Sequence, residues 1–377
     1  MTNPTWIEAS PFRKIDRRST DRGRPIWVQR WAPSPGPACH GPSRGTRAHL
    51  SDISRTSLPE RITRPSPSQA RSPDVLTQPT LYAVEMELGR FGIWTSALDR
   101  QPAEVARSAA RRIEELGFGA LWVGESFRRE AFANSSLLLA ATERLVVATG
   151  IASIWARDAQ AMRAGQLTLA EAYPERFLLG LGVSHVPLVN PRGHQYDRPY
   201  SAMKAYLLAM REAQYDAPRP AAEPKTVLAA LGPRMLDLAA QQADGAHPYF
   251  VPAAHTPLAR ARLGQGKMLC PEQAVVLERV PERARMVARR HTAAYLKLPN
   301  YRHNLLRLGF TEDQMSDGGN DQLVDAIVAW GGPEEIAARV RQHLDLGADH
   351  VAIQVISEDP FAVPVSAWEA LASELGL

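Results

Sequence analysis

A histidine that follows a glycine-rich turn is the first candidate for chemistry. His185 comes directly after the segment GLGVS, residues 180–184, whose glycines let a flat group lie against the backbone. An imidazole can transfer a proton near neutral pH, so His185 is a candidate acid or base. A hydrogen-bonded structural histidine would fit the same position.

The junction Ala230-Leu231-Gly232-Pro233-Arg234 has the composition of an anion site. An apolar run ends here, glycine permits a close backbone approach, and proline opens a helix. Unpaired N–H groups at a helix N-terminus bind phosphate. The junction therefore predicts a phosphate-binding turn, although an ordinary strand-to-helix turn has a similar sequence.

Further candidate residues, most of them polar or aromatic, lie at or just beyond the ends of other apolar runs. They are Trp94, Glu125, Gly150, Ser153, Trp155, Val183, Ser184, His247 and Tyr249. The tryptophans can stack on an aromatic cofactor or simply fill space. Glu125 and Glu130 are typical of a strand-end polar group and a helix N-terminal charge, and we keep Glu125 as a second catalytic candidate.

Several common motifs are missing from the sequence. From residue 86 onward it contains no Gly-x-Ser-x-Gly nucleophile elbow, no Walker A motif, no Gly-x-Gly-x-x-Gly, and no His/Asp/Glu spacing that indicates a metal site. These absences disfavour a hydrolase, a kinase, a Rossmann dehydrogenase and a metalloenzyme.

Apolar runs alternate with amphipathic stretches from residue 86 onward. The pattern predicts strands at 91–95, 120–123, 145–149, 176–182, 226–230, 246–251, 273–277 and 350–356. It predicts helices at 102–116, 134–143, 158–172, 200–213, 233–243, 281–296, 321–330, 334–346 and 365–375.

Eight strands alternating with helices predict a parallel (β/α)8 barrel, that is, a TIM barrel. A doubly wound sheet has the same alternation, but eight regular units favour closure. The C-terminal ends of barrel strands meet at one face, which would gather the candidate residues. Residues 297–320 are too long for a simple connection and predict an insertion near the barrel mouth.

The chain divides into a basic tail and a mildly acidic body. Its 377 residues carry a net charge of +4, but residues 1–85 contribute +6 and residues 86–377 contribute −2. Residues 1–85 also hold 12 of the 30 prolines and lack a hydrophobic period, which predicts a disordered or mis-annotated extension, with translation starting at Met86 as one explanation. We therefore expect one catalytic domain, residues 86–377, without a nucleic-acid role. The sequence has no apolar stretch of 18 residues, so we expect no membrane span.

The body resembles the bacterial luciferase-like flavin and deazaflavin oxidoreductases, which are (β/α)8 barrels. The resemblance runs from about Gly89 to Ile356. It is carried by segments 116–123, Ala148-Thr-Gly-Ile151, 174–182, 231–236 with Ala243-Asp-Gly245, and Gly347-Ala-Asp-His-Val351. Within the family it looks most like an actinobacterial subgroup that is taken to use coenzyme F420.

The resemblance implies roles for the candidates. Residues 229–235 match the loop that holds the cofactor phosphate, and Gly150, Ile151 and Ser153 match a bulge behind the cofactor ring, often with a non-proline cis peptide. His185 matches a carboxylate acid/base of some deazaflavin dehydrogenases. Glu125-Ser126 replaces their Asp-His pair, so their sugar-phosphate and alcohol chemistries do not transfer directly.

Three functions remain open on the sequence. The favoured one is a cytoplasmic F420-dependent oxidoreductase that acts on a small organic substrate. The second is a reduced-FMN monooxygenase with the same pocket, and the third is an inactive barrel that serves as a binding protein. The family leads us to expect a homodimer, while the substrate itself is not readable.

Overall fold

The structure is a computed structural model that describes residues 86–377. The expectations for residues 1–85 lie outside the described residues. No helix among the described residues is long and apolar enough to cross a membrane.

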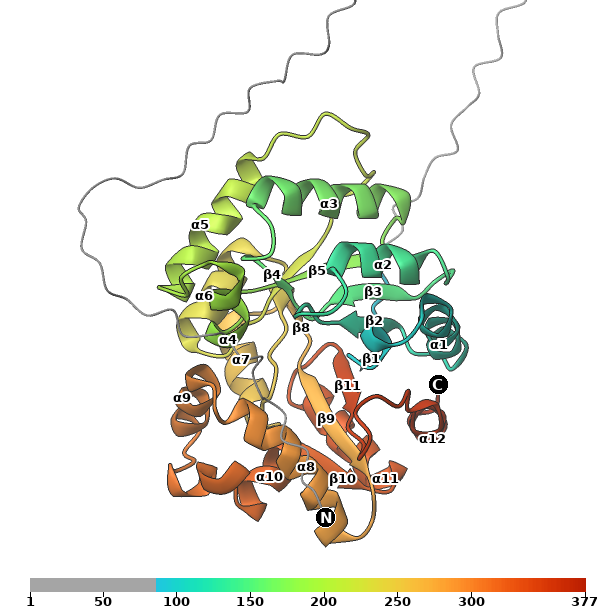
Figure 1. Ribbon diagram of the computed structural model, residues 1–377, viewed down its shortest axis with the longest axis vertical. Helices are drawn as coiled ribbons and strands as arrows, with labels where there is room; N and C mark the ends of the chain where they lie inside the picture. Colours follow the sequence, from blue (N-terminus) through green and yellow to red (C-terminus); the bar gives the residue numbers. More distant parts are fainter. Residues whose placement is uncertain (1–85) are drawn as a thin grey trace, which may run out of the picture. The chain divides into compact units, whose positions relative to one another are not determined.

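A parallel sheet forms the centre of the described region (Figure 1). Its strands are β1 (Phe91–Trp94), β2 (Ala120–Val123), β3 (Val146–Thr149), β4 (Ala152–Ser153), β5 (Phe177–Gly182), β6 (Thr226–Leu228), β7 (Gly245–Ala246), β8 (Met268–Leu269), β9 (Glu272–Leu277), β10 (Val328–Gly331) and β11 (Val351–Val355). All eight predicted strands are present, although β7 is much shorter than the predicted 246–251.

The sheet closes into a barrel because β8 and β9 are two parts of one strand position. β8 pairs with β7 on one side, in the register Ala246↔Leu269. After Cys270 and Pro271 the chain continues as β9, which pairs with β11 in the register Ala352↔Glu272. β11 then pairs with β1, so the order β1-β2-β3-β5-β6-β7-β8/β9-β11 returns to its start. The predicted luciferase-like TIM-barrel fold is confirmed.

Helices surround this barrel (Figure 1). They are α1 (Ala103–Glu115), α2 (Ala131–Leu139), α3 (Ala159–Ala172), α4 (Val186–Val189), α5 (Pro199–Glu212), α6 (Pro233–Gln242), α7 (His255–Leu263), α8 (Pro281–Tyr295), α9 (Pro299–Arg307), α10 (Asp321–Ile327), α11 (Pro333–Asp345) and α12 (Val365–Leu375). The insertion 297–320 contains α9 and the 3-10 turn η3 (Asp313–Gly318).

Two sequence predictions were wrong. The helix predicted at 321–330 ends at Ile327, and β10 follows it and pairs with β9 in the register Val328↔Ala274. Residues 328–331 form a strand because the open edge of β9 supplies hydrogen-bond partners for their backbone. These hydrogen bonds outweigh the helical spacing of the apolar residues. In addition, the segment 251–266, expected to be a loop, contains α7.

The strands are buried on both faces, as a parallel barrel requires. Ala120 and Trp122 of β2 point into a cluster that fills the lumen, whereas Leu121 and Val123 pack outward with the helices. Trp122 is fully buried in the lumen cluster. The lumen is therefore a packed core, and a ligand must bind above it, at the strand ends.

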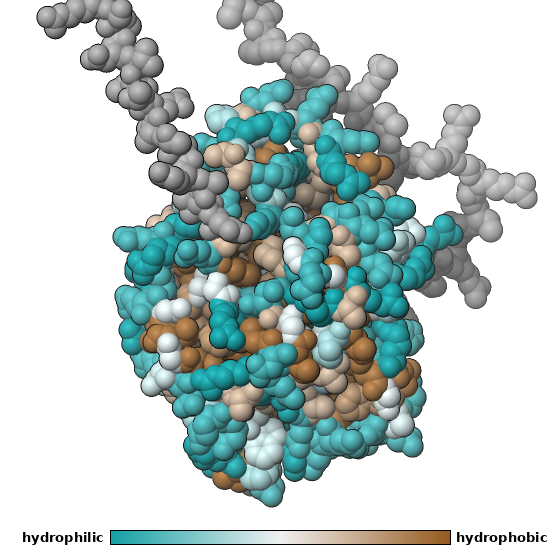
Figure 2. All heavy atoms as spheres, turned by 180° about the vertical axis from the view of Figure 1, so that it is seen from behind, coloured by the Kyte–Doolittle hydropathy of each residue, from teal (hydrophilic) through white to brown (hydrophobic). Residues whose placement is uncertain are grey.

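The outer surface is mainly hydrophilic, with hydrophobic atoms gathered in a band across the middle of the face in Figure 2. The most exposed large apolar side chains are Phe127, Leu258, Leu208 and Val186. Dimer formation stays a prediction.

Candidate functional site

The two strongest sequence candidates follow neighbouring strands. His185 lies three residues after β5 and begins α4, while Gly232 is the N-cap of α6 after β6. β5 and β6 are paired, with Leu181 opposite Leu228. The structure therefore places a titratable side chain and a helix N-terminus at the same end of the barrel.

The insertion contacts His185. Asn300, at the start of α9, hydrogen-bonds the imidazole, and the Tyr301 ring centre lies 5.4 Å from that of His185. Burial lowers the pKa of His185, while the side-chain hydrogen bond with Asn300 acts in the opposite direction. A lowered pKa keeps the imidazole neutral at pH 7, so it can accept a proton.

A bulge with a cis Gly150–Ile151 peptide bond follows β3, as the resemblance implied. The indole Nε1 of Trp94 donates a hydrogen bond to the Gly150 carbonyl at 3.0 Å. A Cβ on residue 150 would lie 2.6 Å from that nitrogen and 3.1 Å from Nε2 of His247. Only glycine fits between these two rings.

The glycines of β5 have a different role from the one predicted. A Cβ on Gly180 would lie 1.9 Å from the Thr149 carbonyl oxygen, and one on Gly182 would lie 2.4 Å from the Ile151 side chain. The space that was assigned to a flat ligand is filled by the bulge itself. These glycines let β3 and β4 approach β5, and so they shape the site indirectly.

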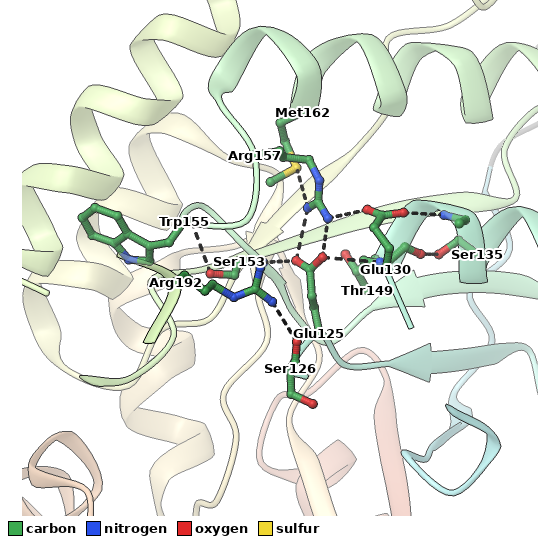
Figure 3. Close-up of polar contacts among 12 residues, drawn as sticks. Glu125, Ser126, Glu130, Ser135, Thr149, Ser153, Trp155, Arg157, Met162 and Arg192 are labelled. Carbon is green, nitrogen blue, oxygen red and sulfur yellow. Dashed lines mark hydrogen bonds and ion pairs between the residues drawn. The ribbon is translucent and has the colours of Figure 1, made fainter. Parts of the chain in front are cut away.

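Glu125 is held in a buried polar network with Arg157 (Figure 3). Both side chains are largely buried, with 3% and 11% of their surfaces exposed. The Glu125 carboxylate also accepts a hydrogen bond of 2.8 Å from the backbone N–H of Ser153. Arg157 contacts Glu130 as well, whose side chain is half exposed and caps α2 through the N–H of Ala133.

This network fixes the bulge from two sides. The backbone N–H of Glu125 donates to the Ile151 carbonyl at 3.1 Å, while its side chain receives the N–H of Ser153. Removing this carboxylate would leave the Arg157 guanidinium buried without its main counter-charge, which is costly. Glu125 therefore has the geometry of a residue that positions the bulge. A catalytic role for it stays a prediction.

The aromatic candidates gather around the strand ends in two groups. Trp94 lies 5.3 Å from Tyr249 between ring centres, beside Gly150. Trp155 lies farther along the bulge, where its Nε1 donates to the Val183 carbonyl at 2.9 Å. Val183 and Ser184 thus connect Trp155 to His185 along the chain.

Tyr249 lies in the middle of a chain of hydrogen bonds at the barrel mouth. Its hydroxyl lies 2.8 Å from Oε1 of Gln354 and 2.7 Å from the hydroxyl of Tyr295. An amide oxygen can only accept, so Tyr249 donates to Gln354 and Tyr295 donates to Tyr249. This arrangement keeps Tyr249 fixed and neutral.

His247 is almost fully buried beneath this layer, with 1% of its surface exposed. It stacks on Trp122 at 4.3 Å, and its Nδ1 lies 2.7 Å from the Cys270 carbonyl. The carbonyl accepts, so Nδ1 carries the proton and Nε2 offers a lone pair, for which the described residues supply no partner. Burial lowers the pKa of His247 to about 4, which keeps the ring neutral.

Glu272 is a buried acid that the sequence prediction missed. It is 1% exposed, its Oε2 accepts the N–H of Phe250 at 3.1 Å, and its Oε1 finds no partner among the described residues. Burial raises the pKa of Glu272 to about 8. An acidic residue at the start of the apolar run 273–277 was the available signal.

The predicted phosphate turn begins α6 with its N-terminus open. Gly232 caps the helix without a side chain, and Pro233 occupies its first position. Arg234 lies over the Tyr200 ring at 4.3 Å, and Nε2 of His255 contacts the Leu231 carbonyl at 2.9 Å. The turn is ordered by its neighbours while leaving its amides available for an anion.

The profile of the luciferase-like monooxygenase family matches residues 86–350. The chain belongs to this family. A comparison with functionally curated proteins found no match.

Solved structures with the same luciferase-like fold bind two kinds of cofactor. One is an F420-dependent secondary alcohol dehydrogenase in complex with an F420-acetone adduct, 15% identical, covering 75% of this chain and 97% of its own, with a TM-score of 0.61. A second is the coenzyme F420-dependent tetrahydromethanopterin reductase of Methanopyrus kandleri, 15% identical, covering 77% and 98%, with a TM-score of 0.62. A third is the oxygenating constituent of 3,6-diketocamphane monooxygenase of Pseudomonas putida with FMN, 11% identical, covering 75% and 95%, with a TM-score of 0.53.

Glu125→Gln should destabilise the domain by about 2–4 kcal/mol, because it leaves the buried Arg157 guanidinium short of one negative charge. Glu130→Gln, at the half-exposed partner, should cost less than about 1 kcal/mol. Urea unfolding of both variants at pH 7 measures the difference. Equal losses would contradict the role given to Glu125.

Glu272→Gln should flatten the pH dependence of stability. A pKa of about 8 in the fold means that the folded state keeps a proton which the unfolded chain releases above pH 4.5. Stability from this group is therefore lost as pH rises from 4.5 to 8, by up to about 1.4 kcal/mol per pH unit. The free energy of unfolding at pH 5 and pH 8 tests this, and a variant with the wild-type slope would refute it.

Proposed function

We propose that the protein is an oxidoreductase that transfers a hydride between the deazaflavin coenzyme F420 and a small organic molecule. One observation carries the proposal. A neutral histidine and an open helix N-terminus follow the paired strands β5 and β6, beside the bulge that ends β3. A phosphorylated cofactor with a flat ring needs this combination of groups.

The residues present fit such a cofactor. The backbone amides at Gly232 and Arg234 would hold its phosphate, and Gly150, Ile151 and Ser153 would support its ring from behind. Val183 and Ser184 would border the ring beside His185. Bound there, the deazaflavin supplies a carbon that accepts or releases hydride, and the protein supplies orientation and a proton.

His185 is suited to the proton transfer that accompanies hydride transfer. When a substrate alcohol is oxidised, its hydroxyl proton must leave as the hydride departs, and a neutral imidazole can accept it. In the reverse direction the protonated imidazole returns the proton to the carbonyl oxygen of the substrate. Asn300 holds the imidazole in place for both directions.

The substrate pocket would lie above Trp94, Trp155 and Tyr249, with His247 below them. The rings of Trp94 and Tyr249 and the fixed hydroxyl network favour a neutral molecule with an apolar body. We further propose that the enzyme works in the cytoplasm as a homodimer.

A reduced-FMN monooxygenase is the second candidate. It is favoured by the structural relative that binds FMN. Both cofactors carry a phosphate on a ribityl chain, so the turn at Gly232 would serve either. Their difference lies at ring position 5, where nitrogen in FMN supports reaction with oxygen and carbon in F420 favours hydride transfer.

Titration of the protein with F420 and with FMN, followed by cofactor fluorescence, separates the two. We expect F420 to bind at least tenfold more tightly than FMN. Tighter binding of FMN would favour the monooxygenase. Binding of neither cofactor would favour a barrel without catalytic function.

His185→Ala should lower turnover by about 100-fold or more with little effect on cofactor affinity, because it removes the proton acceptor and leaves the phosphate turn intact. The exposed His303 of α9 gives a matched control, and His303→Ala should be silent. Screening alcohols with oxidised F420 provides the assay. Alcohol oxidation by the wild type should fall as pH drops through a value below 6.5, since the pKa of His185 is lowered. Unchanged turnover in His185→Ala would exclude it as the acid/base.

A further inference from the structure

One face of α9 carries a row of polar side chains toward the site. Asn300, Asn304 and Arg307 are spaced i, i+4 and i+7, which places them on the same side of a helix. Asn300 bonds His185, as described above. The other two residues have no place in the proton transfer.

Asn304 is a buried amide with an unused donor. Only 2% of its surface is exposed, and its Oδ1 accepts a hydrogen bond of 3.2 Å from Nη2 of Arg307. Its Nδ2 has no hydrogen-bond partner among residues 86–377. A buried donor without a partner is costly, so this position calls for an acceptor that the described chain does not supply.

Arg307 lies against the N-terminus of α6. Its Nη2 is 3.1 Å from the point that a Cβ on Gly232 would occupy. No described carboxylate forms an ion pair with Arg307, although seventeen ion pairs occur elsewhere among residues 86–377. Within residues 86–377 it forms a single hydrogen bond, to Asn304.

Arg234 adds a second positive charge at the same helix end. It is the second residue of α6, and it contacts the Tyr200 ring without forming an ion pair in the described region. A helix N-terminus already carries a partial positive charge, and these two exposed arginines add to it, so an anion would be bound favourably here. The charge pattern at Gly232 is therefore that of a site that is completed by a ligand.

We infer that α9 binds the phosphorylated side chain of the cofactor. Arg307 binds the phosphate, and Asn304 donates a hydrogen bond to an oxygen between the phosphate and the ring. The inference rests on the proposed function and deepens it. It makes the insertion a specificity element, which binds the phosphate end through Arg307 and holds His185 through Asn300.

The length of α9 suits this double contact. Seven residues separate Asn300 from Arg307, which corresponds to about 10 Å along a helix axis. A five-carbon polyol that ends in a phosphate extends over a similar length. The buried Nδ2 of Asn304 lies between the two ends, where the hydroxyl groups of such a chain would lie.

Binding titrations with phosphorylated and unphosphorylated rings test the inference without any turnover. The probes are F420 and FMN, each compared with its phosphate-free counterpart: the ribityl deazaflavin and riboflavin. Arg307→Gln should weaken binding of the phosphorylated cofactor by about 10- to 100-fold, because it removes a charge-assisted contact. Affinity for the phosphate-free ring should change less than about twofold.

Arg302→Gln is the matched control. Arg302 lies on the same helix, carries the same charge and is paired with Glu312. Its replacement should leave all four affinities unchanged. A general electrostatic effect would instead weaken F420 and FMN binding equally in both variants, which would overturn the inference.

Asn304→Asp provides a second, nearly isosteric variant. A carboxylate at this position would neutralise Arg307 and repel a phosphate, so the same selective loss of about tenfold or more is expected. Circular dichroism and thermal melting confirm that each variant is folded.

The outcomes separate the inference from the proposed function. If the wild type binds F420 more tightly than FMN and Arg307→Gln binds F420 equally well, the inference fails and the proposed function stands. If the wild type binds none of the four probes, both fail. If Arg307→Gln weakens the binding of the phosphate-free and the phosphorylated probes by the same factor, Arg307 does not contact the phosphate and the inference fails.

Discussion

The close approach of the β3 bulge to β5 is the constraint on which the rest of the site depends. The Thr149 carbonyl and the Ile151 side chain occupy space that any side chain at 180 or 182 would fill. With the bulge seated there, Glu125 can bond both Ile151 and Ser153, and Trp94 can reach the Gly150 carbonyl. The surface on which a ring can rest is thus set by backbone contacts beneath it.

A second property of the site is the neutrality of its buried titratable groups. Burial depresses the pKa of His247 and raises that of Glu272, so both groups lose their charge at pH 7. The buried charges of the Glu125–Arg157 pair balance each other. Arg234 and Arg307, near the N-terminus of α6, form no ion pair among the described residues. Under the proposed function, the neutral groups would surround the reacting ring, and the two arginines would lie near the cofactor phosphate.

Much of this architecture could be predicted from the sequence. Strand periodicity located all eight barrel positions, and the turn at Gly232 was identified from glycine and proline chemistry. β10 escaped prediction because its four residues become a strand only through the free edge of β9. The contact between His185 and Asn300 could not be predicted either, because Asn300 lies over a hundred residues away in the sequence and contacts His185 only in the folded chain.

Sequence analysis identified residues near the site more reliably than it identified their roles. Gly180 and Gly182 were correctly singled out, but a sequence does not reveal that the chain itself fills the space above them. Glu125 was recognised as polar and near the site, whereas its neutralisation by Arg157 depends on a distance across the bulge. Burial of Glu272 likewise depends on packing that no local pattern records.

The position of α9 outside the barrel has an evolutionary consequence. Successive residues of a helix are rotated by about 100°, so deleting one residue between Asn300 and Arg307 would turn the two ends out of alignment. One end could then keep its contact only if the other lost it. Changes in the length of this helix are thus far more restricted than substitutions on its outer face.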